Sequence, residues 1–214
     1  GIIANGISSS TVGAGRSEGL IGGGGGGGGY GGAGATNLAS GGTPVIKFVT
    51  PSVGGSIGGG SVGSAPGGLG GGVVNLTVPG KLSLDGQISA TGNPGPNFNS
   101  GGGAGGAISL QVQTISGSGL ISANGGAGSN LGGGGAGGAI ALNCDTNLFS
   151  GPITAVGGSG ANFGGAGFVY ITPFAFGKDP RRLIINNGGN RGALTPLSSL
   201  TDLADLTVDG GAVV

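Results

Sequence analysis

The sequence contains no histidine, tryptophan or methionine, and Cys144 is its only cysteine. One cysteine cannot form a disulfide within the chain, and without histidine a zinc site is not expected. Histidine is also the base that activates the serine of G-x-S-x-G hydrolases, so the matches around Ser56 and Ser61 do not predict a nucleophile. The missing residue types therefore argue against the commonest forms of metal and nucleophilic catalysis.

Charge is also scarce in this chain. Charged residues make up 7 % of the sequence, and seven basic residues balance seven acidic ones. This balance offers no basic surface for nucleic acid, and no apolar run approaches the roughly 18 residues of a membrane-spanning helix. We expect neither a nucleic-acid partner nor membrane insertion. Weak charge repulsion instead favours association of the chain with copies of itself.

The few acidic residues do not form the pattern of a catalytic pair or a metal site. Asp85 lies in a repeated block, but Ser118 takes its place in the next copy, so no acidic ladder forms. Asp202, Asp205 and Asp209 cluster near the carboxyl end, where a solvated face is favoured over weak Ca²⁺ binding. We therefore expect a protein that is not an enzyme and that holds no cofactor and no metal ion.

Glycine, by contrast, is abundant, and the glycine-rich text contains a repeat. Glycine accounts for 62 of 214 residues, yet 36 % hydrophobic residues and a mean hydropathy of +0.32 argue against disorder. "GGAGGAISL" at 102–110 recurs 32 residues later as "GGAGGAIAL" at 134–142. A second repeated block reads "LDGQISATGN" at 84–93, "GSGLISANGG" at 117–126 and "FSGPITAVGG" at 149–158.

Within each repeat, apolar residues alternate with polar ones. Ile108, Leu110 and Val112 are separated by Ser or Gln, a period of two that is typical of a half-buried strand. Such strands are too short to fold alone, so stacked copies must share a core. The sequence predicts an all-β fold, a glycine-rich β-solenoid-like repeat array.

The glycine-only stretches need a separate explanation. Residues 20–37, "LIGGGGGGGGYGGAGATN", contain eight consecutive glycines followed by Tyr30. Each ordered glycine costs roughly 0.5–1 kcal/mol relative to alanine in regular structure, which is tolerable where backbones pack too closely for a Cβ. Extended glycine can adopt the threefold conformation of polyproline II, and neighbouring segments can then bond through N–H and Cα–H groups. We favour such polyglycine II-like packing over a mobile loop between strands.

Composition divides the chain into three parts. Residues 1–66 are an N-terminal glycine-rich segment with strands, and residues 67–172 are the array of repeats of about 32 residues. Residues 173–214 are poorer in glycine, as expected of a C-terminal cap or connector with an acidic tail and a terminal strand. "TPLSSLTDLADL" at 195–206 combines an N-capping Thr195, a following proline and leucines three residues apart. This stretch predicts one short helix.

The two ends of the chain resemble parts of the internal repeat. "LTVDGGAVV" at 206–214 resembles "LSLDGQIS" at 82–89, and "GIIANG" at 1–6 resembles "LISANG" at 120–125. A carboxyl end followed by another molecule's amino end would rebuild the internal unit, which predicts open head-to-tail assembly. The alternatives are chance similarity between apolar, glycine-rich ends and a chain that is one segment of a longer repetitive protein. The predicted assembly interface consists of Ile2, Ile3, Leu206, Val208 and Val213.

Two further surface features follow from the pattern. Asn75 begins an Asn-Leu-Thr glycosylation sequon and alternates with Val74, so we expect it to face solvent, where a glycan can attach. Phe98, Leu131 and Phe163 occupy corresponding turns. We favour a stacked column that closes the core over an exposed ridge that binds a partner or a sugar.

The recurring text "GGGAGGAISL…GSGLISANGGAG" resembles the repeats of large secreted glycine-rich surface proteins, adhesin-like or filament-forming, over about residues 67–172. The octaglycine also resembles the polyglycine II bundles of phage tail-fibre adhesin tips. The chain departs from those bundles in its alternating Ile, Leu and Val strands. The resemblance implies a β-solenoid with a structural or adhesive role and carries no catalytic residue.

These observations lead to one main functional expectation and one alternative. The chain begins with Gly1 rather than Met, as expected of a processed product that has lost any signal peptide. We expect a structural subunit of an extracellular filament or surface layer, with copies of itself as partners. The alternative is an adhesin module on a cell or virus surface that recognises polysaccharide or other glycans.

Overall fold

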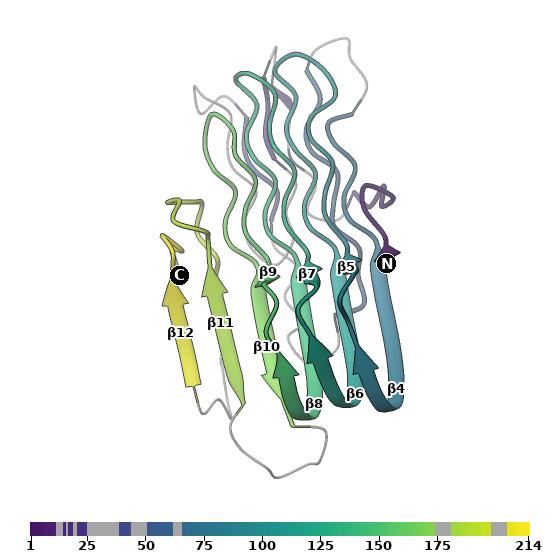
Figure 1. Cartoon of the computed structure of the whole chain (residues 1–214). Coiled ribbons are helices and arrows are strands. Elements are labelled where there is room, and N and C mark those ends of the chain that lie inside the picture. The colour runs from purple at the N-terminus through teal and green to yellow at the C-terminus, as the bar shows by residue number, and fades with distance from the viewer. Residues whose placement is uncertain are drawn as a thin grey trace.

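The computed structural model describes residues 1–11, 15, 17–18, 21–24, 39–43, 51–61, 66–173, 181–197 and 205–214, without the side chains of 17–18. All regular elements within these ranges are β-strands, and no helix occurs among them. The all-β prediction is therefore confirmed. The polypeptide forms a β-solenoid of about three turns, and its elongated shape is clear in Figure 1.

Two sheets run along the solenoid. The larger has the strand order β12-β11-β10-β8-β6-β4 and comprises β4 (Val73–Ser83), β6 (Ala107–Gly117), β8 (Ala139–Phe149), β10 (Phe168–Thr172), β11 (Arg182–Asn186) and β12 (Asp205–Asp209). The smaller has the order β1-β5-β7-β9 and comprises β1 (Ile2–Ile3), β5 (Gln87–Ser89), β7 (Leu120–Ser122) and β9 (Ile153–Thr154). A separate antiparallel pair joins β2 (Ser17–Glu18) to β3 (Ile21–Gly22).

The register of the sheets follows the sequence repeat. Ile88 of β5 lies opposite Ile121 of β7, and Ile121 lies opposite Ile153 of β9. In the larger sheet, β4, β6, β8 and β10 pair in parallel, whereas β11 is antiparallel to β10 and β12 is parallel to β11. One repeat is therefore one turn, and equivalent residues of successive copies stack on each other.

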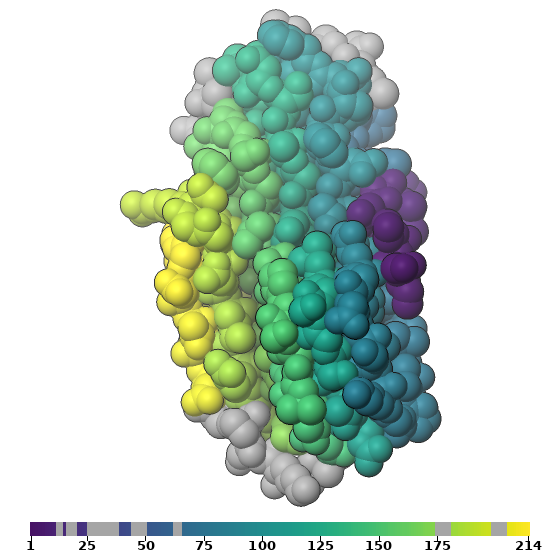
Figure 2. All heavy atoms as spheres, in the orientation of Figure 1, coloured from purple at the N-terminus to yellow at the C-terminus, as the bar shows by residue number. Residues whose placement is uncertain are grey.

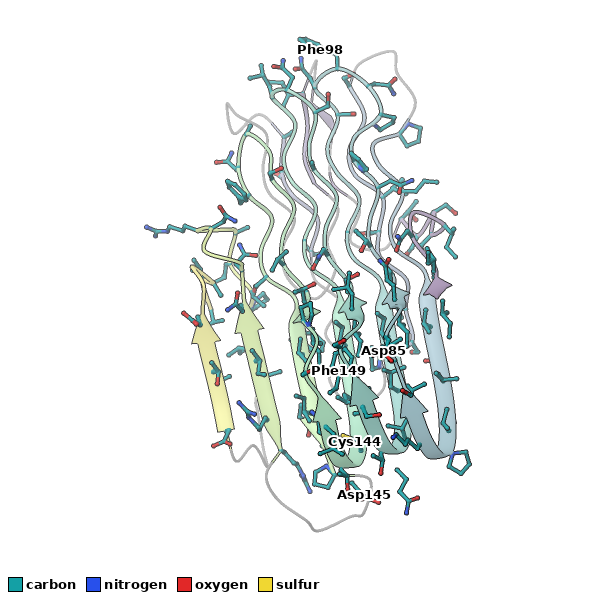
Figure 3. All side chains as sticks on the ribbon, viewed as in Figure 1. Asp85, Phe98, Cys144, Asp145 and Phe149 are labelled. Carbon is teal, nitrogen blue, oxygen red and sulfur yellow. The ribbon has the colours of Figure 1, made fainter. Side chains whose placement is uncertain are left out.

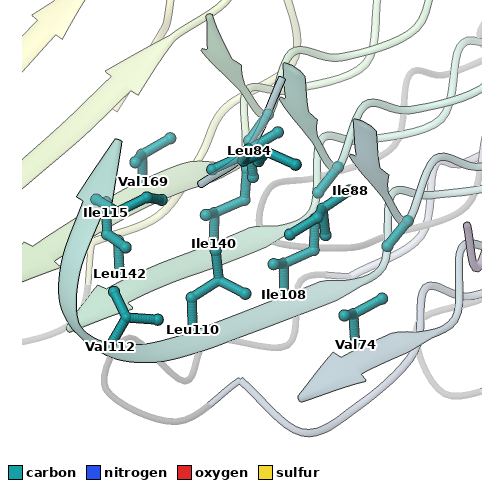
Figure 4. Packing of buried hydrophobic residues seen from close by; sticks show 14 of the residues in the cluster. Val74, Leu84, Ile88, Ile108, Leu110, Val112, Ile115, Ile140, Leu142 and Val169 are labelled. Carbon is teal, nitrogen blue, oxygen red and sulfur yellow. The ribbon is translucent and has the colours of Figure 1, made fainter. Parts of the chain in front are cut away.

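A hydrophobic core fills the space between the two sheets. Ile108, Leu110 and Val112 of β6 are fully buried there and pack beside Ile140 and Leu142 of β8 (Figure 4). Each such side chain contributes roughly 1.5–3 kcal/mol by leaving water. The alternation of the sequence thus places one face of every long strand in a shared core, as predicted.

Glycine-rich segments such as residues 101–106, here called the arms, lie beyond the sandwich formed by the two sheets. Their hydrogen bonds repeat every third residue. Consecutive N–H groups of residues 101–106 point to three different neighbouring segments. The donor–acceptor pairs are Gly101–Gly59 and Ala104–Ser56 on one side, Gly102–Gly133 and Gly105–Ala136 on the second, and Gly103–Asn93 and Gly106–Ala90 on the third. Three directions in three residues is the geometry of a polyproline II helix, so these arms form a polyglycine II-like lattice.

The same lattice explains why the arms need glycine. A Cβ on Gly102 would lie 2.0 Å from the carbonyl oxygen of Gly126, and one on Gly135 would lie 2.0 Å from that of Gly103. Ala104, Ala136 and Ala166 are among the exceptions, and each methyl group is fully buried. Glycine is thus required by backbone packing and not by flexibility.

The octaglycine stretch is described only at its start. Gly22 N–H donates to the carbonyl of Asn99, and the Gly22 carbonyl accepts from Gly133 N–H. The Gly24 carbonyl accepts from Gly42 N–H. Gly22 and Gly24 therefore belong to the lattice, while residues 25–30, including Tyr30, lie outside the described residues.

The predicted helix at 195–206 is wrong where the structure describes it. Asp205 and Leu206 belong to β12, and residues 195–197 form no helix; residues 198–204 lie outside the described ranges. The Thr195 hydroxyl donates to the carbonyl of Ala166 at 2.6 Å and does not cap a helix. The leucine spacing is a weak local preference, which the ladder between β11 and β12 overrides.

Replacing Gly135 with alanine should destabilise the fold because its Cβ would meet backbone that cannot move aside. We expect a loss of at least about 2 kcal/mol, measured as a lower midpoint of thermal unfolding. Gly80→Ala is the matched control, because no heavy atom lies within 4 Å of its Cβ. Equal unfolding midpoints for the two variants would contradict the backbone-packing account.

Candidate assembly interface

The solenoid has two ends, and each exposes two sheet edges. β1 and β4 are the edge strands at one end, and β9 and β12 are the last strands of their sheets at the other. Figures 1 and 2 show the N-terminal residues on one side of the molecule and the C-terminal residues on the opposite side. Edge strands carry unpaired backbone groups and are templates for pairing with another chain.

The N-terminal segment occupies the position of an additional rung in the smaller sheet. Ile2 lies opposite Ile88, so it continues the isoleucine column of the repeats. The Asn5 side-chain oxygen accepts from Thr91 N–H at 2.7 Å, and Asn124 accepts from Val156 N–H at 3.0 Å in the same manner. The similarity between "GIIANG" and "LISANG" is therefore a structural equivalence.

Ile2 and Ile3 are 44 % and 63 % exposed, because no rung of the described chain covers their outer side. At the opposite end, Leu206 and Val208 of β12 are 48 % and 39 % exposed. Val213 is half-buried and bridges to Leu194. The five predicted interface residues thus form two groups at opposite ends, which can meet only between two copies.

The two groups lie in different sheets. β1 belongs to the smaller sheet, whereas β12 belongs to the larger one. Val213 pairs with Leu194 and not with the smaller sheet, so "LTVDGGAVV" does not take the structural position of "LSLDGQIS". In a neighbouring copy, β4 is the edge strand that can continue the larger sheet beyond β12. Likewise, β1 is the edge strand that can continue the smaller sheet beyond β9.

β12 presents both charge and free donors at its edge. Asp205 N–H donates to the carbonyl of Arg181, so the N–H groups of Leu206 and Val208 point away from β11 in this parallel ladder. The Arg182 side chain lies 3.9 Å from the Asp205 carboxylate, and both side chains are about half exposed. Residues 174–180, which precede Arg181, lie outside the described residues.

A hollow of about 220 Å³ lies beside β9 and was not predicted from the sequence. It is lined by Ile153, Thr154, Ala155, Val156, Gly167, Val169, Ile184 and Asn186, all of them uncharged. The Thr154 hydroxyl oxygen is buried and has no hydrogen-bond partner among the described residues. In the preceding rungs the equivalent Ser122 hydroxyl donates to the Ser89 hydroxyl. Ser89, Ser122 and Thr154 occupy equivalent positions in successive repeats, so the sequence did contain a signal for this site. Thr154, the last of the three, lies in the final strand of the smaller sheet.

The tip of the glycine arms carries exposed apolar side chains. Phe98 is 73 % exposed, Leu131 is exposed and Phe163 is half-buried, so the predicted column that closes the core is wrong. Figure 3 shows Phe98 at the far end of the arms. Asn99 and Asn130 turn the chain there with φ of 63° and 48°, and the Asn130 amide donates to the Asn99 side-chain oxygen at 2.6 Å. These turns direct the apolar residues outward, because the lattice beneath them packs backbone against backbone and has no space for a large side chain.

Asn75 lies on the outer face of β4 and is exposed, while its neighbour Val74 is buried. The prediction that Asn75 faces solvent is confirmed. Pro51, Ser52 and Thr77 lie with it around a shallow pocket. Glycosylation of Asn75 stays a prediction.

One titratable side chain, Asp85, has a structural role. Asp85 accepts from Ser118 N–H at 3.0 Å and so links two successive turns. No group of three potential metal ligands occurs among the described residues. Within the same residues, no helix has the length and apolar character needed to cross a membrane. Cys144 is buried opposite Val112, and burial, with a smaller contribution from Asp145, raises its pKa from 9.0 to about 11.

Comparisons with family models, with curated proteins and with solved structures found no match for this chain. Function is therefore inferred from the geometry of the strand edges, the hollow and the tip.

The raised pKa predicts a protected thiol and a decline of stability at alkaline pH. Below pH 9 both states hold the proton; between about pH 9 and 11 the unfolded thiol releases it while the folded thiol keeps it, which favours unfolding. At pH 8 we expect slow reaction of native Cys144 with a disulfide reagent and rapid reaction in guanidinium. The Cys144→Val variant should lose less stability between about pH 9 and 11 than the unaltered protein, because it has no thiol to ionise. Fast labelling of the native protein would contradict the prediction.

Proposed function

We propose that this protein is a structural subunit of an extracellular filament or surface layer that assembles head to tail. The observation that carries the proposal is that both ends of the solenoid expose strand edges, with β4 and β12 each paired on one side only within the described residues. A contact between two different ends of identical molecules yields an open polymer wherever its rotation does not close into a ring. The extracellular location rests on the resemblance to secreted glycine-rich surface proteins.

The larger sheet suggests how two copies meet. β12 runs antiparallel to the first part of β4, because β11 reverses direction relative to β10. An antiparallel pair between β12 and the next copy's β4 would place Asp205 toward the bend that carries the exposed Lys81. Opposite charges at the two edges favour this orientation over contacts between identical ends.

The body of the subunit suits a mechanical role. The lattice of residues 101–106 connects each arm to three neighbours through backbone hydrogen bonds, and the sandwich beside it has a continuous apolar core. Such stacking distributes load over many equivalent bonds.

Electron microscopy of the 214-residue chain at micromolar concentration, without ligand, tests the proposal. We expect fibres with a regular axial repeat. Leu206→Pro should shorten or abolish them, because it removes an N–H that points away from β11. Thr207→Pro is the control for folding, because that N–H faces β11 and its loss should lower the thermal midpoint. Discrete particles from the unaltered chain would contradict the filament proposal.

A second candidate function is favoured by the exposed Phe98 at the tip. An adhesin would use this apolar ridge, flanked by asparagines, to recognise a glycan, since aromatic faces and amide groups both contact sugars. A glycan screen on discrete particles would test it. Binding by unassembled protein would favour this second function over the structural one.

A further inference from the structure

The outer edge of β9 is prepared for one more parallel strand. Ile121 N–H donates to the Pro152 carbonyl at 3.0 Å, and Ala123 N–H donates to the Thr154 carbonyl at 2.8 Å. In a parallel ladder, alternate residues face opposite neighbours. The backbone groups of Ile153 and Ala155 therefore point away from β7. The Ala155 carbonyl accepts from Gly167 N–H at 2.7 Å, which leaves the Ile153 carbonyl and the Ala155 N–H for a further strand.

The outer edge of β1 has the complementary arrangement. Ala4 N–H donates to the Ser89 carbonyl at 2.7 Å, and Gly6 N–H donates to the Thr91 carbonyl at 2.9 Å. By the same alternation, the backbone groups of Ile3 point away from β5. The exposed segment that already forms a rung in this sheet thus presents free donors and acceptors on its other side.

We propose that residues 1–6 of a second copy insert into the hollow beside β9, with Ile2 opposite Ile153 and Ile3 opposite Thr154. This inference rests on the proposed function and names the contact that joins two subunits. In this register Ile3 N–H faces the Ile153 carbonyl and Ala155 N–H faces the Ile3 carbonyl. These groups have no backbone partner in the part of the chain that the structure describes. A shift by one residue would turn the side chains to the wrong face and oppose groups that already have partners.

The lining of the hollow fits this segment. Val169 and Ile184 of the larger sheet belong to its lining, and none of the lining residues is charged. "GIIANG" is likewise uncharged in its side chains. Its inward-facing positions in this register, Ile2 and Ala4, are both apolar. The same sequence type occupies the equivalent rungs at Ile88 and Ile121, so the hollow needs no new kind of recognition.

The extent of the two sheets shows that the segment must leave its own β5. The larger sheet continues past β8 by three strands, β10, β11 and β12, while the smaller sheet ends at β9. A second copy stacked with its β4 against β12 therefore holds its own β1 behind β12, two strand spacings, or about 10 Å, from the position next to β9. About three extended residues span that distance, so residues 7–9 provide the link and the two hydrogen bonds between Ser8 and Gly70 are broken in the exchange.

The residues facing these two positions differ in polarity. Thr207 lies opposite Ile184 in the register, so Asp205, Thr207 and Asp209 share the inner face of β12. An isoleucine segment behind β12 would face carboxylates, whereas beside β9 it faces Val169 and Ile184. The exchange gives up one parallel ladder and forms an equivalent one, which is why strand swapping of this kind costs little.

Disulfide trapping tests the contact in the full-length chain, in a Cys144→Val background that has no other thiol. Ile3→Cys with Thr154→Cys places the two sulfurs on directly opposed residues of adjacent parallel strands, within the Cα separation that a disulfide allows. We expect a ladder of covalent dimers, trimers and larger species on a non-reducing gel. Ile3→Cys with Leu206→Cys is the matched control for a joint through β12 and should give no ladder.

A third pair, Ile3→Cys with Ser89→Cys, reports whether the segment stays on its own β5, because Ile3 lies opposite Ser89 within one chain. We expect this intrachain bond in monomers and its loss in assembled material. Fibres without a ladder from the 3–154 pair would overturn this inference and leave the filament proposal standing. A dimer ladder without fibres would support the contact and contradict the filament. Neither fibres nor a ladder would overturn both.

Discussion

The structure depends on one constraint, which is that backbones in the glycine arms approach each other too closely for a side chain. A Cβ on most arm glycines would lie about 2 Å from a neighbouring carbonyl oxygen, as it would at Gly102 and Gly135. In return, the N–H groups of residues 101–106 all find carbonyl acceptors in three surrounding segments. Buried backbone groups need hydrogen-bond partners. Here the carbonyl groups of neighbouring arms are the acceptors that an adjacent strand would provide in a sheet. The lattice is therefore a second kind of core, held by backbone hydrogen bonds instead of side-chain burial.

The two kinds of core support each other because one chain turn passes through both. Each turn forms a strand of the larger sheet, a rung of the smaller sheet and two glycine segments, so equivalent residues are stacked in both halves. The isoleucine column fixes the register of the sandwich. That register in turn aligns successive arms, so that alanines such as Ala104 and Ala136 recur where a methyl group fits. Because of this coupling, each end of the solenoid is an edge of the sandwich and also of the glycine lattice. These edges are the physical basis of the assembly proposal.

Sequence reasoning predicted the parts of the fold that depend on periodicity. The repeat placed Ile88, Ile121 and Ile153 in one column, and the structure stacks them. The resemblance of "GIIANG" to "LISANG" also matched Ile2 to that column, and the register of β1 places it there. The filament role, the extracellular location and the assembly interface stay predictions.

Features that depend on tertiary packing could not be obtained in this way. The leucine spacing at 195–206 indicated a helix, but Leu206 lies in a strand because β11 offers a complete ladder. Phe98 was expected in a core, yet the lattice beneath the tip has no space for a large side chain. The hollow beside β9 arises because the two sheets end at different rungs, and no local pattern encodes where a sheet ends.

Hydrogen exchange of the backbone amides tests the central claim of a hydrogen-bonded glycine lattice most directly. The account predicts that the amides of residues 101–106 exchange as slowly as those of the buried strand β6, because both are opened only by sub-global unfolding. Exchange of these glycine amides at the rate of an unstructured peptide, with β6 still protected, would show that the arms are spacers and would contradict the account.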